Sequence, residues 1–409
     1  MSDSGVPANL IEDVEEQQPG GTRRMVLNMG PQHPSTHGVL RLLIELDGEN
    51  IAKCEPDIGF LHTGIEKECE VKTYQQAVTL TDRVDYLAPL SNNLCYCLAA
   101  EKLLQLEIPP QAQWMRVMLT ELTRLNSHLV WLATHAIDIG AMSVFLYCFR
   151  EREKILDLFE WASGARMMTS YIRIGGVAVE PPAGWREMVG KFLKMLPSRV
   201  DEYEALLTGN RIWQARLKNV GRISLADAIA YSLSGPMLRA AGLAYDNRRA
   251  FPYSSYEEFQ FNIPTRTESD CYARYMVRVA EMRESLKIVE QAMAKITDHG
   301  EIKAEAPGIV PPPREKMKTE MEALIYHFKI WTEGFSPPPG DAYVAIESPR
   351  GELGCYVVSD GSPKPLRCHF RSPSFVNLQA LPKLIEGQLI ADSIACIGTI
   401  DIVLGDVDR

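Results

Sequence analysis

The apolar residues of this chain repeat with a helical period over most of its length, and no other feature constrains the fold as much. Between about residues 65 and 335, apolar side chains recur every three or four positions. The clearest runs are Met115, Met118, Leu122, Leu125, Leu129 and Leu132, and then Tyr275, Val279, Met282, Leu286, Val289 and Met293. This spacing brings apolar side chains to one face of a helix. The pattern therefore predicts a central helical bundle.

Both flanks of the helical region have a strand-like pattern instead. Residues 25–29 and 39–46 alternate apolar and polar side chains, with a turn signal at Asp47-Gly48. Residues 343–347 and 354–358 are also strand-like in composition. We expect β-rich parts over residues 24–60 and 341–409, with the helices at 65–335, and we expect the two β-rich ends to meet. No break in composition divides residues 24–409, so the prediction is one α+β domain.

The helix boundaries can be predicted at two places. Residues 265–268 (Thr-Arg-Thr-Glu) have the spacing of a capping box, and Gly300 has the position of a C-terminal stop for the helix that follows. The proline triplets at residues 311–313 and 337–339 flank one further helix.

Composition and charge exclude several classes of protein. A net charge of −10 argues against nucleic-acid binding, which requires a clustered basic face. We find no apolar run of the length that crosses a membrane. The nine scattered cysteines are odd in number and indicate a reducing compartment. Residues 1–23 carry several acids without a basic start or an apolar stretch, so we expect a disordered acidic lead and no secretory signal.

The common cofactor motifs are missing from the sequence. There is no Gly-x-Gly-x-x-Gly after a strand and no phosphate-binding loop, so we expect no nicotinamide dinucleotide or nucleotide on this chain. There is no Cys-x-x-Cys either, which argues against an iron-sulfur or zinc site. His33 and His37 have the spacing of a helical metal pair, but Pro31 and Pro34 oppose a helix there. We therefore expect no metal site.

Residues 30–38 (Gly-Pro-Gln-His-Pro-Ser-Thr-His-Gly) stand out between two predicted strands. The paired prolines and glycines favour a rigid, sharply turning loop that carries two imidazoles. A structural reading remains open, in which the histidine and hydroxyl side chains only satisfy nearby backbone groups.

Six further segments, taken with this loop, decide between the two readings. They are residues 61–67 (Leu-His-Thr-Gly-Ile-Glu-Lys), 81–86 (Thr-Asp-Arg-Val-Asp-Tyr), 138–141 (Asp-Ile-Gly-Ala), 163–167 (Ser-Gly-Ala-Arg-Met), 171–176 (Tyr-Ile-Arg-Ile-Gly-Gly) and 398–409 (Gly-Thr-Ile-Asp-Ile-Val-Leu-Gly-Asp-Val-Asp-Arg). In this order they resemble the 49 kDa subunit, also called the D subunit, of respiratory complex I, the NADH-quinone oxidoreductase. The resemblance covers the chain from about Arg24 to its last residue.

The resemblance implies a fold related to the large subunit of nickel-iron hydrogenases, with a quinone headgroup where those enzymes hold their metal centre. A hydrogenase itself is excluded, because its large subunit needs a Cys-x-x-Cys pair near each end. The family also implies that quinone, ubiquinone or menaquinone, is the substrate and that this chain binds no metal, flavin or NAD. FMN and iron-sulfur clusters would belong to partner subunits.

The resemblance also implies partners and a location. The iron-sulfur-cluster B subunit and the C subunit would be neighbours in the peripheral arm, and the membrane H subunit would meet the chain at the quinone channel. We expect a peripheral position on the cytoplasmic face of a bacterial inner membrane, as part of a proton-translocating respiratory complex.

By the same resemblance, His37 and Tyr86 are the hydrogen-bond and proton donors to the quinone, and Asp138 is the carboxylate that pairs with His37. A carboxylate on one imidazole nitrogen favours the imidazolium, which can donate a proton. We expect the loss of this pairing to be the signal that is passed toward the pump subunits. From the residues alone, Tyr86 could be a half-buried core tyrosine and Asp138 a helix-end cap.

Five more residues are assigned by the resemblance. Thr134 and Val403 line the quinone pocket, and Val403 lies on a returning C-terminal strand. Arg83, Met168 and Thr63 lie near the partner's iron-sulfur cluster. Many relatives carry histidine at the position of Met168, and mitochondrial relatives carry arginine at Thr63. The loss of titratable or cationic neighbours would lower the cluster's potential and its pH dependence, which favours an acceptor such as menaquinone.

Two alternatives to this function stay open. The same site could belong to a relative of complex I that receives electrons from ferredoxin or a deazaflavin. The chain could also be a structural connector between the peripheral and membrane arms, and such a connector would not require His37, Tyr86 and Asp138 together.

Overall fold

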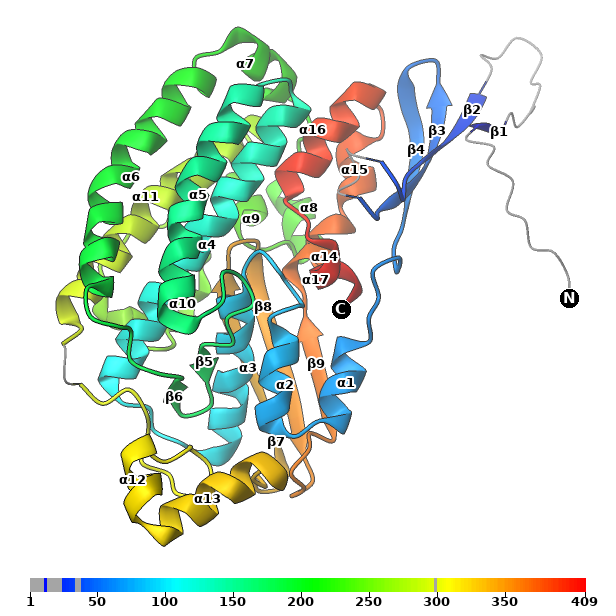
Figure 1. The fold of residues 1–409 in the computed structure, drawn as a ribbon. Helices are drawn as coiled ribbons and strands as arrows, with labels where there is room; N and C mark the ends of the chain where they lie inside the picture. Colours follow the sequence, from blue (N-terminus) through cyan, green and yellow to red (C-terminus); the bar gives the residue numbers. More distant parts are fainter. Residues whose placement is uncertain (1–10, 13–23, 34–37, 298–299) are drawn as a thin grey trace, which may run out of the picture.

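The N-terminal strands form an antiparallel sheet that extends away from the body of helices (Figure 1). The computed structural model describes residues 11–12, 24–33, 38–297 and 300–409. In sheet order, the strands are β1 (Ile11–Glu12), β2 (Arg24–Met29), β3 (Arg41–Asp47) and β4 (Asn50–Asp57). Leu42, Ile44 and Leu46 of β3 are buried, as the alternation predicts. Gly48, at φ 65°, turns the chain between β3 and β4 at the predicted position.

The predicted helical region holds most of the helices, with one short hairpin and several loops between them. The helices before the hairpin are α1 (Ile65–Val71), α2 (Tyr74–Thr81), α3 (Pro89–Leu104), α4 (Pro110–Asp138) and α5 (Met142–Ser163). The hairpin pairs β5 (Ile172–Arg173) with β6 (Gly176–Val177). After it come α6 (Trp185–Leu207), α7 (Arg211–Leu217), α8 (Leu225–Ala230), α9 (Pro236–Ala240), α10 (Asn247–Ala250), the 3-10 helix η2 (Tyr256–Glu258), α11 (Cys271–Lys295), α12 (Arg314–Thr319) and α13 (Met321–Thr332).

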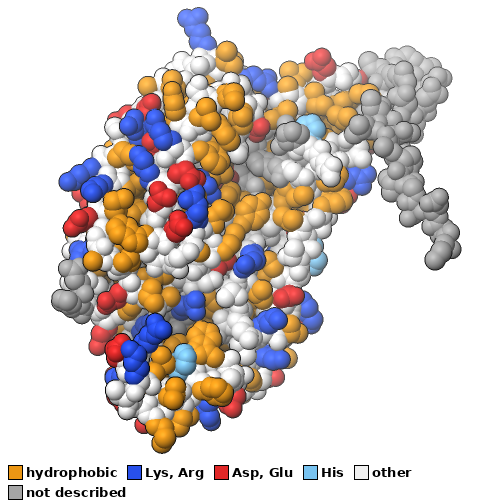
Figure 2. Space-filling view, in the orientation of Figure 1, with side chains coloured by type: hydrophobic (Ala, Val, Ile, Leu, Met, Phe, Trp, Pro, Cys, Tyr) orange, Lys and Arg blue, Asp and Glu red, His pale blue; other side chains and the backbone are white. Residues whose placement is uncertain are grey.

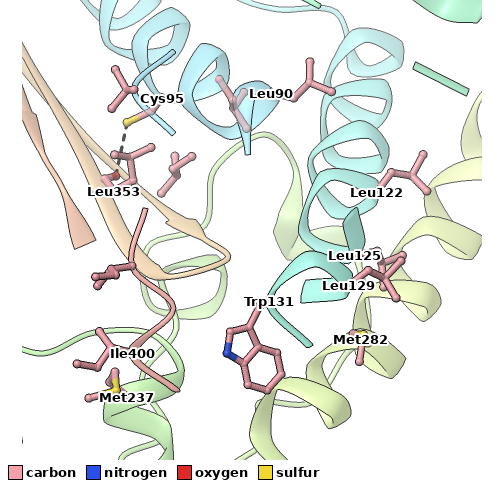
Figure 3. Packing of buried hydrophobic residues seen from close by; sticks show 14 of the residues in the cluster. Leu90, Cys95, Leu122, Leu125, Leu129, Trp131, Met237, Met282, Leu353 and Ile400 are labelled. Atoms are coloured by element: carbon pink, nitrogen blue, oxygen red, sulfur yellow. Dashed lines mark hydrogen bonds between the residues drawn. The ribbon is translucent and has the colours of Figure 1, made fainter. Parts of the chain in front are cut away.

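The long helix α4 is the centre of the core. Its predicted apolar face is buried, and Leu122, Leu125 and Leu129 lie toward Met282 of α11 (Figure 3). The predicted face of α11 is buried as well, except that Met293 is half-buried at its C-terminal end. The helical periods of the sequence therefore correctly located the two main packing faces.

The predicted start and end of α11 are wrong. Asp270 caps the helix, and its carboxylate accepts a hydrogen bond from the Ala273 N–H at 2.7 Å. The residues of the expected capping box come before the helix, because Ser269, at φ 54°, turns the chain immediately before Asp270. At the other end, Gln111 donates to the Thr297 carbonyl at 2.6 Å and accepts from its N–H at 3.1 Å. These bonds replace helical ones, so α11 ends at Lys295 and not near Gly300.

The segment between the two proline triplets holds two helices rather than one. Glu320, with φ −116° and ψ 118°, is extended and separates α12 from α13. Five apolar side chains of α13 are exposed, namely Met321, Leu324, Ile325, Phe328 and Trp331. Hydrophobic side chains are visible at the lower edge of the molecule in Figure 2, where Figure 1 places α13.

The C-terminal part is β-rich only in its first half. A second antiparallel sheet has the order β7 (Gly340–Ser348), β8 (Gly351–Ser359) and β9 (Arg367–Arg371). Four short helices then follow, α14 (Pro373–Leu378), α15 (Leu381–Ile385), α16 (Ile390–Ile400) and α17 (Leu404–Asp408). The expected strand at Val403 is wrong, since this residue caps α17. Ser372 and Pro373 end the strand region, because Ser372 caps α14 and proline favours a first helical turn.

The two ends of the chain meet, as expected, but they do not share a sheet. Ile51 of β4 donates to the Gln388 carbonyl at 2.9 Å and accepts from the Gly387 N–H at 2.8 Å. Ile390 donates to the Glu49 carbonyl at 3.0 Å. The contact therefore runs through the segment between α15 and α16. The fold is α+β, as predicted from the sequence.

A buried ion pair fastens α3 to α4 and to the β5–β6 hairpin. The Arg116 guanidinium donates to the Glu101 carboxylate at 2.9 Å and to the carbonyls of Arg173 and Gly176 at 2.8 and 3.2 Å. The Gly175 N–H donates to the same carboxylate at 2.8 Å. Both charged side chains are almost fully buried, so each needs the other to offset its loss of water.

We predict that Glu101→Ala destabilises the chain by about 3–5 kcal/mol, because it leaves the Arg116 charge buried without a partner. Chemical denaturation monitored by circular dichroism measures the change in the free energy of unfolding. As a control, Lys67→Ala removes the ion pair with Glu70, in which the lysine side chain is 80% exposed, and should change the free energy by less than about 0.5 kcal/mol. If the two substitutions changed the free energy of unfolding equally, Glu101 would not be the partner that offsets the buried charge of Arg116.

Candidate functional site

The loop of residues 82–88, between α2 and α3, holds Tyr86 against the C-terminal helix α17. A Cβ atom on Gly405 would lie 2.9 Å from the Val84 carbonyl oxygen and 3.1 Å from Cε1 of the Tyr86 ring. Since carbon atoms rarely approach an oxygen atom this closely, a larger residue at 405 would push the helix and the loop apart. Glycine is required here for a close approach, which seats the tyrosine on the C-terminal segment.

The hydroxyl group of Tyr86 is available to a ligand. The residue is half-buried, and its oxygen has no hydrogen bond to any of the residues that the structure describes. Burial raises the pKa of the phenol, and the neighbouring Asp85 raises it further, while Arg350 acts in the opposite direction. Tyr86 is therefore a neutral hydrogen-bond donor at physiological pH.

Val403 lies two residues before the glycine that contacts Tyr86. It is buried, and its N–H donates to the Ser374 hydroxyl at 3.4 Å. Its carbonyl oxygen accepts from the N–H groups of Asp406 and Val407, both at 3.0 Å, which forms the first turn of α17. The structure therefore brings the segments of two predicted site residues, Val403 and Tyr86, together.

Thr134 and Asp138 share one face at the end of α4, because they are four residues apart. Thr134 is half-buried, and its hydroxyl donates to the carbonyls of Val130 and Trp131, both at 3.1 Å. Asp138 is partly buried, and burial raises its pKa to about 6. It forms no ion pair with any described residue, and its side chain caps neither α4 nor α5. The cap alternative for Asp138 is therefore wrong.

The end of α4 packs on the helix that leads to Val403. The Trp131 indole donates to the Gly398 carbonyl of α16 at 2.7 Å. A Cβ on Gly398 would lie 2.4 Å from Nδ1 of His135, so α16 approaches α4 one turn before Asp138. No hydrogen bond or ion pair joins Asp138 to Tyr86 within the described residues.

His37 lies outside the described residues, together with positions 34–36. The described flanks of the loop end at His33 and resume at Gly38, between β2 and β3. The pairing of His37 with Asp138 therefore stays a prediction.

Arg83 and Met168 lie on two loops that the structure joins. Asp82, next to Arg83, accepts hydrogen bonds from the Ser170 N–H at 3.1 Å and from the Ser170 hydroxyl. Arg83 is exposed, and its guanidinium donates to the Thr79 carbonyl at 2.6 Å. Met168 is half-buried two residues before Ser170. A cation and a thioether are thereby presented on neighbouring loops.

Thr63 lies in a different loop, which is bound to the C-terminus. The Asp408 carboxylate accepts from the Gly59 N–H at 2.8 Å and from the Leu61 N–H at 2.7 Å. The side chain of Thr63 itself is exposed, immediately before the Gly64 cap of α1. No hydrogen bond or ion pair joins Thr63 to Arg83 within the part of the chain that the structure describes.

Four residues that shape this region were not predicted from the sequence, namely Asp85, Arg350, Gly405 and Asp408. Asp85, Gly405 and Asp408 lie inside the segments quoted for the resemblance. Their only signal in the sequence is that these segments contain closely spaced aspartates and a glycine. Arg350 had no such signal, because it lies in a turn between two strands and its role depends on tertiary contacts alone.

A cleft of about 1010 Å³ lies elsewhere, between α4, α6 and the chain after α11. Met115, Met118, Trp185, Lys191 and Met293 are among its lining residues. It contains none of the predicted site residues. Tyr86, Thr134 and Asp138 are each half-buried, so the walls described above are partly open to solvent.

Metal-binding clusters and membrane spans were also searched for over the described ranges. No group of three or more His, Cys, Asp or Glu side chains could hold a metal ion there. The nine cysteines are all buried and not disulfide-bonded. Among the helices of these ranges, none combines the length and the apolar character needed to cross a bilayer.

The fold and the geometry define an α+β protein with a candidate polar site, partly open to solvent, at the junction of its C-terminal segment, the 82–88 loop and the end of α4. A family model described as "Respiratory-chain NADH dehydrogenase, 49 Kd subunit" matches residues 138–409. The chain belongs to this family, whose members are also called the D subunit of NADH-quinone oxidoreductase, and the resemblance drawn from the motifs is confirmed.

Similar curated proteins cover nearly the whole chain. The NADH-quinone oxidoreductase D 1 subunit of Solibacter usitatus (strain Ellin6076) is 70% identical over 410 residues, covering 100% of each chain. The D 2 subunit of Koribacter versatilis (strain Ellin345) is 64% identical over 390 residues, covering 95% of this chain and 97% of the relative. The D 2 subunit of Chloroflexus aurantiacus (strain ATCC 29366 / DSM 635 / J-10-fl) is 60% identical over 398 residues, covering 97% of each.

Asp82 generates a prediction for the pH dependence of stability. Burial raises its pKa from 3.8 to about 6, so the folded chain binds this proton more tightly than the unfolded chain. The free energy of unfolding therefore falls as the pH rises from about 4 through 6. Asp82→Asn keeps an acceptor for Ser170 and removes the buried charge. It should raise the free energy of unfolding at pH 8, relative to pH 4, by about 2 kcal/mol.

Denaturant titrations at pH 4 and pH 8 measure this difference. Asp157→Asn is the matched control, since the Asp157 side chain is 62% exposed and its substitution should have almost the same effect on stability at both pH values. An Asp82→Asn protein whose stability differs from the wild type equally at both pH values would contradict the prediction, and would mean that hydrogen bonding to Ser170 dominates.

Proposed function

We propose that this chain is the quinone-binding core subunit of a proton-translocating NADH-quinone oxidoreductase, complex I, in which it passes electrons from a neighbouring subunit's iron-sulfur cluster to quinone. Family membership supports the assignment to this complex. The observation that carries the quinone site is the half-buried Tyr86, whose hydroxyl has no partner among the described residues and whose ring is seated on Gly405.

Quinone reduction requires side chains that donate a hydrogen bond to the quinone oxygens and can also give up a proton. The reduction of a quinone to a quinol consumes two electrons and two protons, and each carbonyl oxygen gains one proton. Tyr86 is proposed to hydrogen-bond one oxygen and to give up its proton there, and His37 to serve the other oxygen. The raised pKa of the Tyr86 phenol keeps the proton in place until the quinone oxygen becomes basic on reduction.

Asp138 is proposed to hold His37 as an imidazolium. Burial alone raises the pKa of Asp138 to about 6, and no described cation offsets this. An imidazolium beside the carboxylate would lower the pKa again and gain from the attraction. When His37 gives its proton to the quinone, this attraction is lost and Asp138 is free to interact elsewhere. This change of charge is proposed as the signal that reaches the pump.

Arg83, Met168 and Thr63 are proposed to face the neighbouring subunit's cluster. Arg83 supplies an exposed cation that forms no ion pair with a described residue, and a cation favours the more negative, reduced cluster. Met168 and Thr63 add no titratable group. These residues support an iron-sulfur cluster whose reduction potential depends weakly on pH. They also support a low-potential acceptor such as menaquinone.

The proposed partners are the B and C subunits of the peripheral arm and the membrane H subunit, with this chain in a peripheral position at the cytoplasmic face of the inner membrane. Exposed apolar side chains on α13, together with Ile137, Met142 and Leu146 at the end of α4 and the start of α5, support burial against other chains. The iron-sulfur-cluster B subunit would close the open side of the site. The fold is proposed to be that of a nickel-iron hydrogenase large subunit without its metal.

The test is Tyr86→Phe and His37→Ala in the assembled complex. Each should lower the rate of quinone reduction by at least about 100-fold, because a proton donor is lost. Electron transfer from the donor to a water-soluble artificial acceptor should be unchanged, since that route does not use the quinone site.

Tyr326→Phe is the matched control, because this exposed tyrosine of α13 hydrogen-bonds only with Glu322 among the described residues. It should reduce quinone at the wild-type rate. Quinone reduction that survives both site substitutions would contradict the proposal and favour the structural-connector alternative.

A second experiment addresses the coupling. Asp138→Asn should uncouple the complex, so that quinone is still reduced but fewer protons are pumped per quinone. Proton uptake by sealed vesicles, measured together with the oxidation of the donor, gives this ratio. An Asp138→Asn complex that pumps at the wild-type ratio would rule out Asp138 as the source of the signal.

A further inference from the structure

A buried arginine beside the proposed quinone site is surrounded by carboxylates. Arg350 lies in the turn between β7 and β8, and it donates to the Asp85 carboxylate at 2.7 Å. It also donates to the backbone carbonyl of Asp401 at 3.0 Å and lies 3.4 Å from its carboxylate. All three side chains are buried. Arg350 therefore joins the Tyr86 loop to the end of α16.

A third carboxylate belongs to the same cluster. Asp406 of α17 is buried, and one of its oxygens accepts from the Ser374 N–H at 3.0 Å. It is electrostatically coupled to both Asp85 and Arg350. One oxygen of Asp406 and one of Asp401 are buried and have no hydrogen-bond partner among the described residues. The cluster thus contains acceptor capacity that the surrounding chain does not use.

The charges of this cluster do not balance. One further cation faces it, Arg278 of α11, which donates to the Ile400 carbonyl at 3.3 Å and interacts with Asp401. Arg278 also interacts with Glu281, and Arg274 adds repulsion to it from the same helix. Three carboxylates therefore face two guanidinium groups, one of which is shared. One excess negative charge in a buried site is costly, and a bound proton removes it.

Two members of the cluster, Asp85 and Arg350, interact electrostatically with Tyr86. Asp85 directly precedes the tyrosine, and Asp406 directly follows the glycine on which the Tyr86 ring rests. We propose that Asp401 and Asp406 share one proton beside Arg350 and Asp85, and that this proton replaces the one that Tyr86 gives to the quinone. The inference rests on the proposed role of Tyr86, and it assigns to these carboxylates the supply of protons to that residue.

The step balances without any electron transfer. After the phenol has given its proton to the quinone oxygen, a carboxylic acid of the cluster gives its proton to the phenolate oxygen. The products are a carboxylate, which Arg350 stabilises, and the restored phenol. The proton moves from a stronger to a weaker acid, because an ordinary phenol has a pKa near 10 and burial raises that of Tyr86. A proton from solvent then refills the cluster.

The pH dependence follows from the direction of the shifts. Burial raises the pKa of Asp401 to about 6 and that of Asp406 to about 6, above the ordinary value of 3.8. The shared proton is therefore present below pH 6 and is lost as the pH rises through this value. Replacing either aspartate by asparagine removes a negative neighbour, so the remaining carboxylates hold the proton less tightly. The loss should then occur at lower pH.

The test measures steady-state quinone reduction in the assembled complex as a function of pH, because only repeated turnovers require Tyr86 to regain its proton. In the wild type, the rate should fall as the pH rises above about 6. Asp401→Asn and Asp406→Asn should each move this fall to lower pH by about one unit, the shift expected for removing one nearby like charge. Electron transfer to a water-soluble acceptor should be unchanged at every pH.

Asp392→Asn is the matched control. This aspartate lies on α16, which ends immediately before Asp401, is buried, and pairs with Arg216 at 3.2 Å rather than with Arg350. The pH profile of this variant should be that of the wild type. If Asp401→Asn and Asp406→Asn lower the rate equally at all pH values, the cluster is only structural and the inference is overturned.

Infrared spectroscopy of the wild-type complex provides a test that needs no variant to be active. With ¹³C-labelled aspartate, the wild type should give a protonated carboxyl band that disappears as the pH rises through about 6, and Asp82 and Asp138 contribute to this band as well. The contribution of the cluster is the part of the band that is lost in Asp406→Asn at the same pH. If the wild-type cluster shows no such protonated carboxyl, the inference fails even when Tyr86→Phe abolishes quinone reduction. If Tyr86→Phe reduces quinone normally, the proposed function fails instead.

Discussion

The contact of the C-terminal helix with the 82–88 loop is the constraint on which the site depends. Gly405 allows the backbone of α17 to approach the Val84 carbonyl and the Tyr86 ring, and Arg350 fastens the same two segments through Asp85 and Asp401. This contact brings Tyr86 and Gly405, which are more than 300 positions apart in the sequence, to one surface. Asp401 adopts the left-handed conformation, at φ 61°, at the point where α16 ends and the chain turns toward α17. The arginine that binds its carbonyl therefore holds a turn that few residue types adopt readily.

Much of the fold could be predicted from the sequence because it follows from local patterns. The alternation in β3 and the helical repeats of α4 and α11 reflect which side chains must leave water, and these faces are buried as expected. The boundaries of α11 could not be predicted in the same way. The side chain that ends this helix, Gln111, comes from another helix, and such a tertiary contact leaves no local signal. The helices after residue 372 were missed for a related reason, since they are short and held mainly by packing against other elements.

The features of the candidate site likewise fall into two groups, those that sequence motifs indicate and those that only tertiary contacts reveal. Tyr86, Asp138, Thr134 and Val403 were assigned by the resemblance to the family. From the residues alone, a core tyrosine was the preferred interpretation of Tyr86, and a helix cap was an alternative for Asp138. The structure adds what motifs do not contain, namely a Tyr86 hydroxyl that no described residue binds and the buried carboxylates beside it. A site that is open on one side fits a subunit whose remaining walls come from other chains. On the proposed function, an iron-sulfur cluster of a neighbouring subunit would reduce the quinone from that open side, next to Arg83.

The central claim is that quinone binds at the junction of the 82–88 loop and the C-terminal segment. The most direct measurement is photolabelling of the assembled complex with a quinone analogue that carries a photoreactive headgroup, followed by identification of the labelled peptides. We predict label on residues 82–88 and 401–409, and competition by unlabelled quinone. Label on residues 180–194, in the cleft beside α6, or label that quinone does not displace, would contradict the claim.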